Sequence, residues 1–129
     1  MVYTIDYIDK KGRQCCLFDI QVYLEHKKDI WQVGEGWRTE CRCVCFGQGI
    51  AQYIYDGNIE DDETLKEFQE DVNEIVNIRG FLHEQHRNYW FTGNTAEKEA
   101  REVMETVFIP NIEKKLMDFA IKWKFKMRK

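Results

Sequence analysis

The spacing of apolar residues changes once along this chain of 129 residues, and the change limits the folds open to it. Up to about residue 56, apolar and polar residues alternate in short runs, which is the period of a half-buried β-strand. From about residue 61 the apolar residues recur every three or four positions, as on one face of an α-helix. The pattern therefore predicts an α+β protein with its strands first and its helices after them.

Five strands are expected in the first part of the chain. They are VYTIDYI (2–8), CLFDIQVYL (16–24), IWQV (30–33), TECRCVCF (39–46) and IAQYIY (50–55). The segments DKKGR, HKKD, GEG and GQG separate them and are typical of turns. Because the links are short, successive strands are expected to pair as an antiparallel meander.

Two long amphipathic helices are expected after the strands. Asp61 or its neighbour is the expected cap of the first helix, and Gly80 is expected to end or loosen it. Asn94 is the expected N-cap of the second, with Glu97 completing a capping box. Pro110 lies within this second helix and predicts a kink or a split there.

A sheet and two helices of this size are expected to form one domain, residues 1–129, with the sheet in 1–58 and the helical part in 59–129. Both helices are expected to pack on one sheet face. The other face is not clearly polar, since alternation places Cys15, Leu17 and Tyr23 on it. Large exposed apolar patches mark interfaces and two-fold dimers are the commonest oligomers, so a homodimer is expected.

The composition excludes several classes of function. The chain contains no serine, so it has no serine nucleophile and no GxSxG motif. Five cysteines without a secretion signal argue against a disulfide framework, and no apolar run is long enough to span a membrane. A cytoplasmic protein without a cofactor is therefore expected.

Charge is unevenly distributed along the chain. The net charge of −4 divides into −2 over residues 1–60, −7 over 61–110 and +5 over 111–129. The basic end, IKWKFKMRK, is read either as a helix C-terminus with a frayed tail or as a short basic strand or arm. A pI near 5.4 argues against general nucleic-acid binding.

The segment CRCVC places Cys41, Cys43 and Cys45 on one side of a strand. Structural zinc sites usually take cysteine pairs from two tight turns, whereas buried free cysteines behave as small apolar residues. Core packing is the favoured interpretation, and a metal site formed by these three residues is the alternative.

The segment HEQH is one residue shorter than the zinc-protease motif HExxH, so it lacks the geometry of that motif. A small enzyme is still conceivable, with His83 or His86 as general acid or base beside Glu84 and Arg87. A nucleotide-like substrate would suit such a group.

The segment RNYWFTGN joins the two expected helices and carries three aromatic residues in a row. Aromatic rings beside cations can stack on a flat ring while the cations hold an anion. The alternative is a structural plug between the helices and the sheet. The candidate ligand-binding or partner-binding residues are His83, His86, Arg87, Tyr89, Trp90 and Asn94.

The glycine pairs in GEGW and GQGI lack the phosphate-loop pattern. The absence of catalytic motifs, the aromatic content and the uneven charge favour a small binding protein without turnover. It would be an inhibitor or a module that sequesters a protein partner or a small anionic or aromatic ligand, of the kind common in phages and mobile elements.

Overall fold

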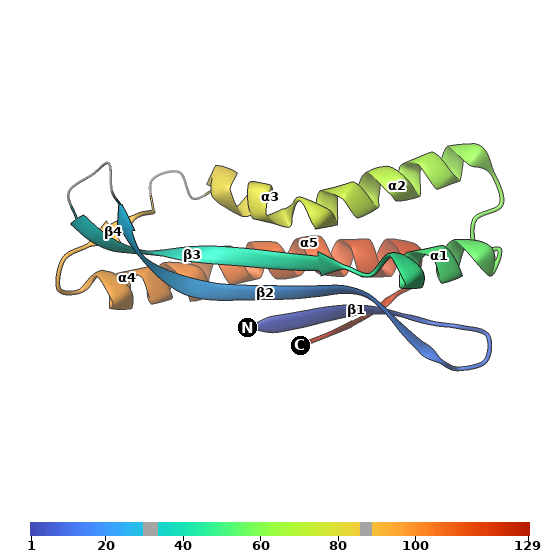
Figure 1. The fold of residues 1–129 in the computed structure, drawn as a ribbon, viewed down its shortest axis with the longest axis horizontal. Coiled ribbons are helices and arrows are strands. Elements are labelled where there is room, and N and C mark those ends of the chain that lie inside the picture. Colours follow the sequence, from blue (N-terminus) through green and yellow to red (C-terminus); the bar gives the residue numbers. More distant parts are fainter. Residues whose placement is uncertain (30–33, 86–88) are drawn as a thin grey trace.

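The structure is a computed structural model, and it describes residues 1–29, 34–85 and 89–129. The fold is α+β, as predicted (Figure 1). The sheet contains β1 (Val2–Ile8), β2 (Gln14–Asp29), β3 (Gly34–Cys45), β4 (Phe91–Thr92) and β5 (Lys126–Arg128). The spatial order is β4-β3-β2-β1-β5, and neighbouring strands are antiparallel.

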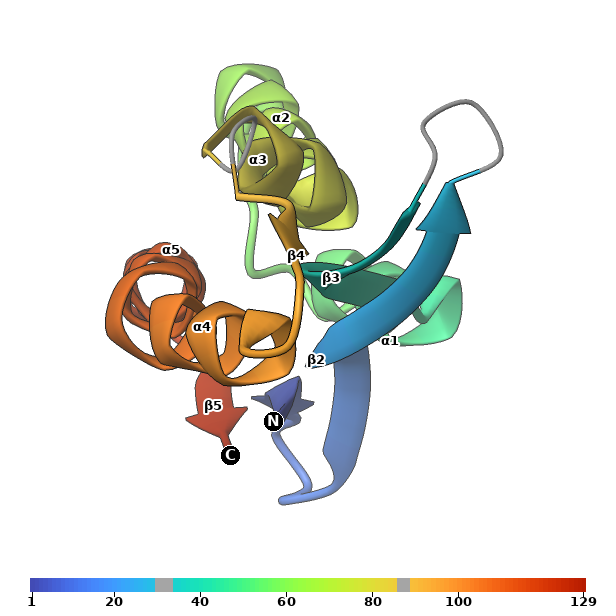
Figure 2. The same ribbon diagram turned by 90° about the vertical axis from the view of Figure 1, so that its left-hand side faces the viewer.

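The helices are α1 (Gly47–Tyr55), α2 (Asp62–Val76), α3 (Ile78–Gln85), α4 (Ala96–Val103) and α5 (Ile109–Trp123), with a π-helical turn η1 (Met104–Phe108) before α5. Figure 2 shows α4 and α5 on one side of the curled sheet, with α2 and α3 beyond β3. Among the described residues, no helix is long and apolar enough to cross a membrane.

The first two expected strands are confirmed, but β2 and β3 are longer than expected. Their ladder continues from Phe18 paired with Cys45 to Asp29 paired with Gly34. The turns expected at HKKD and at GEG are therefore wrong, because both segments keep the strand pairing. The expected strand IWQV lies outside the described residues.

Residues 47–55 form the helix α1, where a strand was expected, so that prediction is wrong. Ile50, Tyr53 and Ile54 follow helical spacing, and all three lie in or against the core. Gly49 lets α1 approach β2 closely, because a Cβ atom at this position would collide with the carbonyl oxygen of Cys16. This contact between segments distant in sequence favours the helix over local strand propensity.

A β-bulge changes which residues of β2 face the core. The β1–β2 register leaves one residue of β2 without a partner, between the pairs Ile5 with Phe18 and Asp6 with Cys16. That residue, Leu17, is fully buried, and beyond it Cys15 pairs with the buried Tyr7. Directly paired residues share a face, so Cys15 lies on the core side. The expectation that Cys15 and Leu17 form an apolar outer face is therefore wrong.

The first expected helix is present in two parts, α2 and α3. Asp61 caps α2 as predicted, since its carboxylate accepts the Thr64 N–H at 2.7 Å. The interruption is at Asn77 and not at Gly80, which lies inside α3. The Asn77 side chain donates to the Asn73 carbonyl and so satisfies one of the last carbonyls of α2.

The second expected helix is also interrupted, as Pro110 predicts. The π-turn η1 precedes the proline, and the Ile109 N–H reaches back to the Met104 carbonyl. Pro110 then stands in the first turn of α5, where a missing N–H costs least. The apolar stripe of this helix is largely buried, through Ala96, Ala100, Met104, Phe108, Ile112, Leu116, Phe119 and Trp123.

The basic end of the chain is used mainly within the molecule. Lys122 pairs with Glu67 and Asp71, at 2.6 and 2.7 Å, and so ties α5 to α2. The chain then turns at Lys124 and forms β5, which pairs with β1. The basic end therefore combines the two sequence interpretations, since residues 121–123 end α5 and residues 126–128 form a short strand and not a frayed tail.

Candidate functional site

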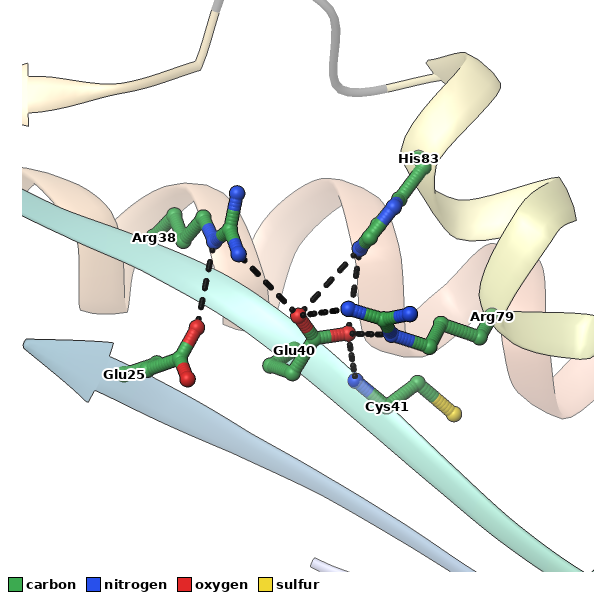
Figure 3. Close-up of polar contacts among 6 residues, drawn as sticks. All are labelled: Glu25, Arg38, Glu40, Cys41, Arg79 and His83. Atoms are coloured by element: carbon green, nitrogen blue, oxygen red, sulfur yellow. Dashed lines mark hydrogen bonds and ion pairs between the residues drawn. The ribbon is translucent and has the colours of Figure 1, made fainter. Parts of the chain in front are cut away.

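Glu40 is a buried carboxylate on β3, and it is the centre of the most extensive polar cluster in the described part of the chain (Figure 3). Arg79 of α3 donates to it from Nε at 2.8 Å and from Nη2 at 3.2 Å. The Nε2 atom of His83, also on α3, lies 3.0 Å from Oε1. The backbone N–H of Cys41 donates to the same oxygen at 3.0 Å, and Nη2 of Arg38 donates to the other oxygen, Oε2, at 3.4 Å.

The sequence positions these partners through simple helix geometry. Arg79 and His83 stand four residues apart, so they share one face of α3. That face lies against the outer edge of β3, which β4 pairs only at Gly36 and Trp37. The cluster thus covers part of an exposed strand edge, which would otherwise be open to pairing with another chain.

The electrostatics of the cluster hold Glu40 ionised. Burial alone would raise its pKa, but hydrogen bonds from Arg79 and the Cys41 N–H, together with the charge and hydrogen bond of His83, lower the pKa to about 2. A carboxylate with so low a pKa is a poor proton acceptor at neutral pH. The arrangement suits docking of α3 and not general-base chemistry.

Arg38 links this cluster to the aromatic segment. It pairs directly across the ladder with Glu25, whose carboxylate accepts from its Nε at 3.2 Å. Its guanidinium also lies over the ring of Trp90, 5.8 Å from the ring centroid. Arg38 is therefore held by two carboxylates while it supports an aromatic ring.

Trp90 is half-buried and rests on Gly36. A Cβ atom at Gly36 would overlap the indole ring, so only glycine leaves room for it. Tyr89 instead packs edge-on against Phe108, with ring centroids 5.4 Å apart. The neighbouring rings of the aromatic segment therefore pack in different places: Tyr89 lies against the core, and Trp90 lies on the sheet.

The structure brings together only some of the residues predicted to form a site. His83 joins the cluster through its contact with Glu40, and Trp90 joins it through its contact with Arg38. His86 and Arg87 lie outside the described residues. Asn94 is exposed before α4, and the expectation that it caps this helix is wrong, because Thr95 holds the N-cap position.

The predicted capping box is also wrong. The Oε1 atom of Glu97 lies 3.6 Å from Nη2 of Arg101, one turn further along the helix. The N-cap residue Thr95 makes no side-chain hydrogen bond to the first turn. Glu84 is an exposed residue of α3, whereas His83, its neighbour in sequence, faces Glu40.

Sequence reasoning missed Glu40, Arg38 and Arg79. A signal for Arg79 was present, because Arg79 and His83 at a helical spacing of four indicate a cationic pair that could face one carboxylate. Nothing local identified that carboxylate, since Glu40 follows the ordinary alternation of its strand.

The three cysteines of CRCVC share a strand face, as predicted, through their pairing with Val22, Ile20 and Phe18. Burial raises the pKa of Cys41 to about 12 and that of Cys43 to about 11, which disfavours the thiolate that binds metals. Across residues 1–29, 34–85 and 89–129, no group of three or more His, Cys, Asp or Glu could hold a metal ion. Core packing accounts for Cys41 and Cys43.

Three hollows mark the surface away from this cluster. One of about 190 Å³ lies between α2 and α5 beside Lys115 and Asp71. A second, of about 330 Å³, lies beside Cys16 and Gln52, and a third, of about 400 Å³, beside Tyr7 and Lys124. Neither Glu40 nor Trp90 lines any of the three.

Comparison of the chain with protein-family models, with curated proteins and with solved structures finds no match.

Proposed function

We propose that this chain is a small binding protein without turnover, which acts as an inhibitor or a sequestering module in the cytoplasm. It binds through the surface formed by Trp90, Arg38 and His83 at one end of the sheet. The observation that carries the proposal is the stacked pair of Trp90 and Arg38, which is fixed from below by Gly36 and Glu40.

Such a pair favours binding because it is already ordered. A tryptophan and an arginine supply much contact area, and both types are common among the residues that dominate interfaces. Two carboxylates hold the guanidinium here, so binding loses little side-chain entropy. The half-exposed indole leaves an aromatic surface for a ligand ring or a partner side chain.

The enzyme alternative, with His83 or His86 acting beside Glu84 and Arg87, receives less support. His83 faces a carboxylate with a lowered pKa, and this pair already serves to dock α3. The metal alternative at Cys41, Cys43 and Cys45 is disfavoured by the raised thiol pKa values. The homodimer is not part of the proposal, because two of its three apolar residues lie on the core side.

A thermal-shift screen of the purified chain against nucleotides, aromatic carboxylates and candidate partner proteins tests the proposal. A ligand at a hundred times its Kd should add about 2.7 kcal/mol to the free energy of unfolding. Trp90→Ala should abolish that gain, whereas Tyr55→Ala, which removes an aromatic ring exposed on α1, should leave it unchanged.

The contrary result is turnover of a substrate. If the chain converts one of these compounds, and His83→Ala lowers the rate by about a hundredfold or more, the enzyme alternative replaces the binding proposal.

A further inference from the structure

The outer face of the sheet continues from the Trp90 surface along β2 and β3. Direct pairing places Val2, Gln21 and Arg42 in one row of this face, and Thr4, Asp19 and Val44 in the next. Tyr23 lies beside them, paired with Glu40, and Arg38 follows on the same side. Val2, Tyr23 and Val44 are large apolar side chains left exposed.

On this face most of the positively charged side chains are more exposed to solvent than the negatively charged ones. Two of its carboxylates, Glu40 and Asp6, are buried, with side chains 4% and 2% exposed, whereas Asp19 and Glu25 are half-buried. The cations that pair with the two buried carboxylates remain outside, with Arg79 at 58% and Arg128 at 45%. A face with nearly balanced formal charge therefore presents positive groups on a molecule of net charge −4.

Arg42 is the central cation of this face. It is exposed, and it forms no ion pair or side-chain hydrogen bond with any described residue. Its neighbours across the ladder are the uncharged Gln21 and, diagonally, Tyr23 and the half-buried Asp19, with which it forms no ion pair. An arginine without a carboxylate partner beside a tyrosine and exposed valines resembles the centre of a protein interface.

We infer that the outer sheet face, centred on Arg42 and Tyr23, is the docking surface for a partner protein that presents acidic side chains. The inference rests on the proposed binding function and names the partner's chemistry. Carboxylates of the partner meet Arg42 and the outward-facing cations, while its apolar side chains cover Val2, Tyr23 and Val44. The Trp90–Arg38 pair forms one end of the same surface.

Two other occupants fit the face less well. A single-stranded nucleic acid needs several phosphate contacts, and the net charge of the chain opposes a polyanion of that size. A second copy docked about a two-fold axis at Arg42 would bring two cationic faces together.

Binding of a short poly-L-glutamate peptide, compared with poly-L-lysine and with single-stranded poly-dT of matched charge, tests the inference at low ionic strength. Poly-L-glutamate should bind and should shift the NMR amide signals of β2 and β3. Arg42→Glu should weaken this binding by about tenfold or more, and Tyr23→Ala should also weaken it.

The control is Arg101→Glu, which reverses another exposed arginine, on α4, and should leave the affinity unchanged. Because both arginines are on the surface, neither reversal should destabilise the fold much. The melting temperature of each variant checks that it is folded. Amide shifts confined to other elements, or equal losses in the two charge reversals, would overturn the docking surface.

Three further outcomes would also overturn it. Tighter binding of poly-dT would assign the face to nucleic acid, and self-association lost in Arg42→Glu would assign it to a second copy. Absence of poly-L-glutamate binding would remove the acidic partner. The binding proposal would survive that last result if some other compound bound and Trp90→Ala abolished its binding.

Discussion

Glu40 shows how a single buried charge can organise a fold. Its carboxylate receives donors from its own strand, from α3 and from Arg38, so that most of its lone pairs are used. Desolvation of a carboxylate is costly unless such partners are present. The cluster is therefore expected to hold α3 in place more than to add a large net stability.

Replacing this carboxylate should be costly. Glu40→Gln leaves Arg79 and His83 facing a neutral amide, and it should lower the free energy of unfolding by roughly 1–3 kcal/mol. Urea denaturation at neutral pH measures the change. Glu97→Gln, which weakens an exposed pair on α4, is the matched control and should cost less than about 0.5 kcal/mol. Equal effects of the two variants would contradict the structural role of Glu40.

Acid should act on the same residue. The pKa of Glu40 is lowered from 4.5 to about 2 by folding, so the unfolded chain binds the proton first as the pH falls. The stabilisation is complete above about pH 4.5 and is lost progressively toward pH 2. Urea denaturation across this window should show a smaller loss of stability for Glu40→Gln than for the wild-type chain, and parallel losses would refute this assignment.

Lys124 is a second residue whose conformation carries a testable cost. It ends α5 with φ of 62°, the left-handed conformation that glycine adopts at helix ends. Lys124→Gly should raise the free energy of unfolding by up to about 1 kcal/mol, because side chains other than glycine are strained there. Lys124→Ala, which removes the lysine but keeps a Cβ atom, should give no such gain in thermal denaturation. A gain from alanine as large as that from glycine would point to the lysine charge as the cause.

At the scale of elements, the sequence predicted what depends on local patterns. The strand 2–8, the cap at Asp61, the buried stripe before Trp123 and the irregularity at Pro110 all follow from spacing and backbone chemistry. What it missed depends on partners far along the chain. Residues 47–55 are helical because Gly49 fits against β2, and the Leu17 bulge requires the β1 register.

The candidate site shows the same division. His83 and Trp90 were identified from residue type and from their place between helices, and both join the Glu40 cluster through its arginines. Arg38 and Glu40 could not be identified, because only the path of α3 along β3 brings them to those residues. Local patterns thus pointed to the end of the sheet where the Glu40 cluster lies, but not to its ion pairs.

The contact of Trp90 with β3 gives a prediction at this scale. Gly36→Ala inserts a Cβ atom where the indole ring lies, and it should destabilise the fold by roughly 1–3 kcal/mol. In a Trp90→Ala background the same change should cost much less, because the obstacle is gone. Urea denaturation of the four proteins completes this double-mutant cycle. Additive effects would show that the ring does not rest on Gly36.

At the scale of the whole molecule, much of the uneven charge of the sequence is paired within the molecule. The acidic α2 lies beside the basic α5, and Lys122 and Lys115 join them through Asp71, Glu67 and Glu74. The exposed Arg42 lies instead on the outer face of the sheet. Sequence charge alone therefore did not show which of these charges are paired within the molecule.

Salt should weaken this internal attraction. Raising the potassium chloride concentration at neutral pH should lower the melting temperature, since exposed ion pairs are screened. Lys122→Met removes the cation that contacts two carboxylates, and its melting temperature should depend less on salt. A melting temperature of the wild-type chain that rises with salt over the same range would contradict the account of α2 and α5.

The central claim is that Glu40 is a buried anchor that stays ionised at neutral pH, beneath the proposed binding surface, and not a catalytic base. Titration of its side-chain carboxyl carbon by NMR tests this claim most directly. The account predicts a pKa of about 2 for that carboxyl group in the folded chain. A pKa at or above the ordinary value of 4.5 would contradict it, because the carboxylate would then lack the donors of Arg79, His83 and the Cys41 amide.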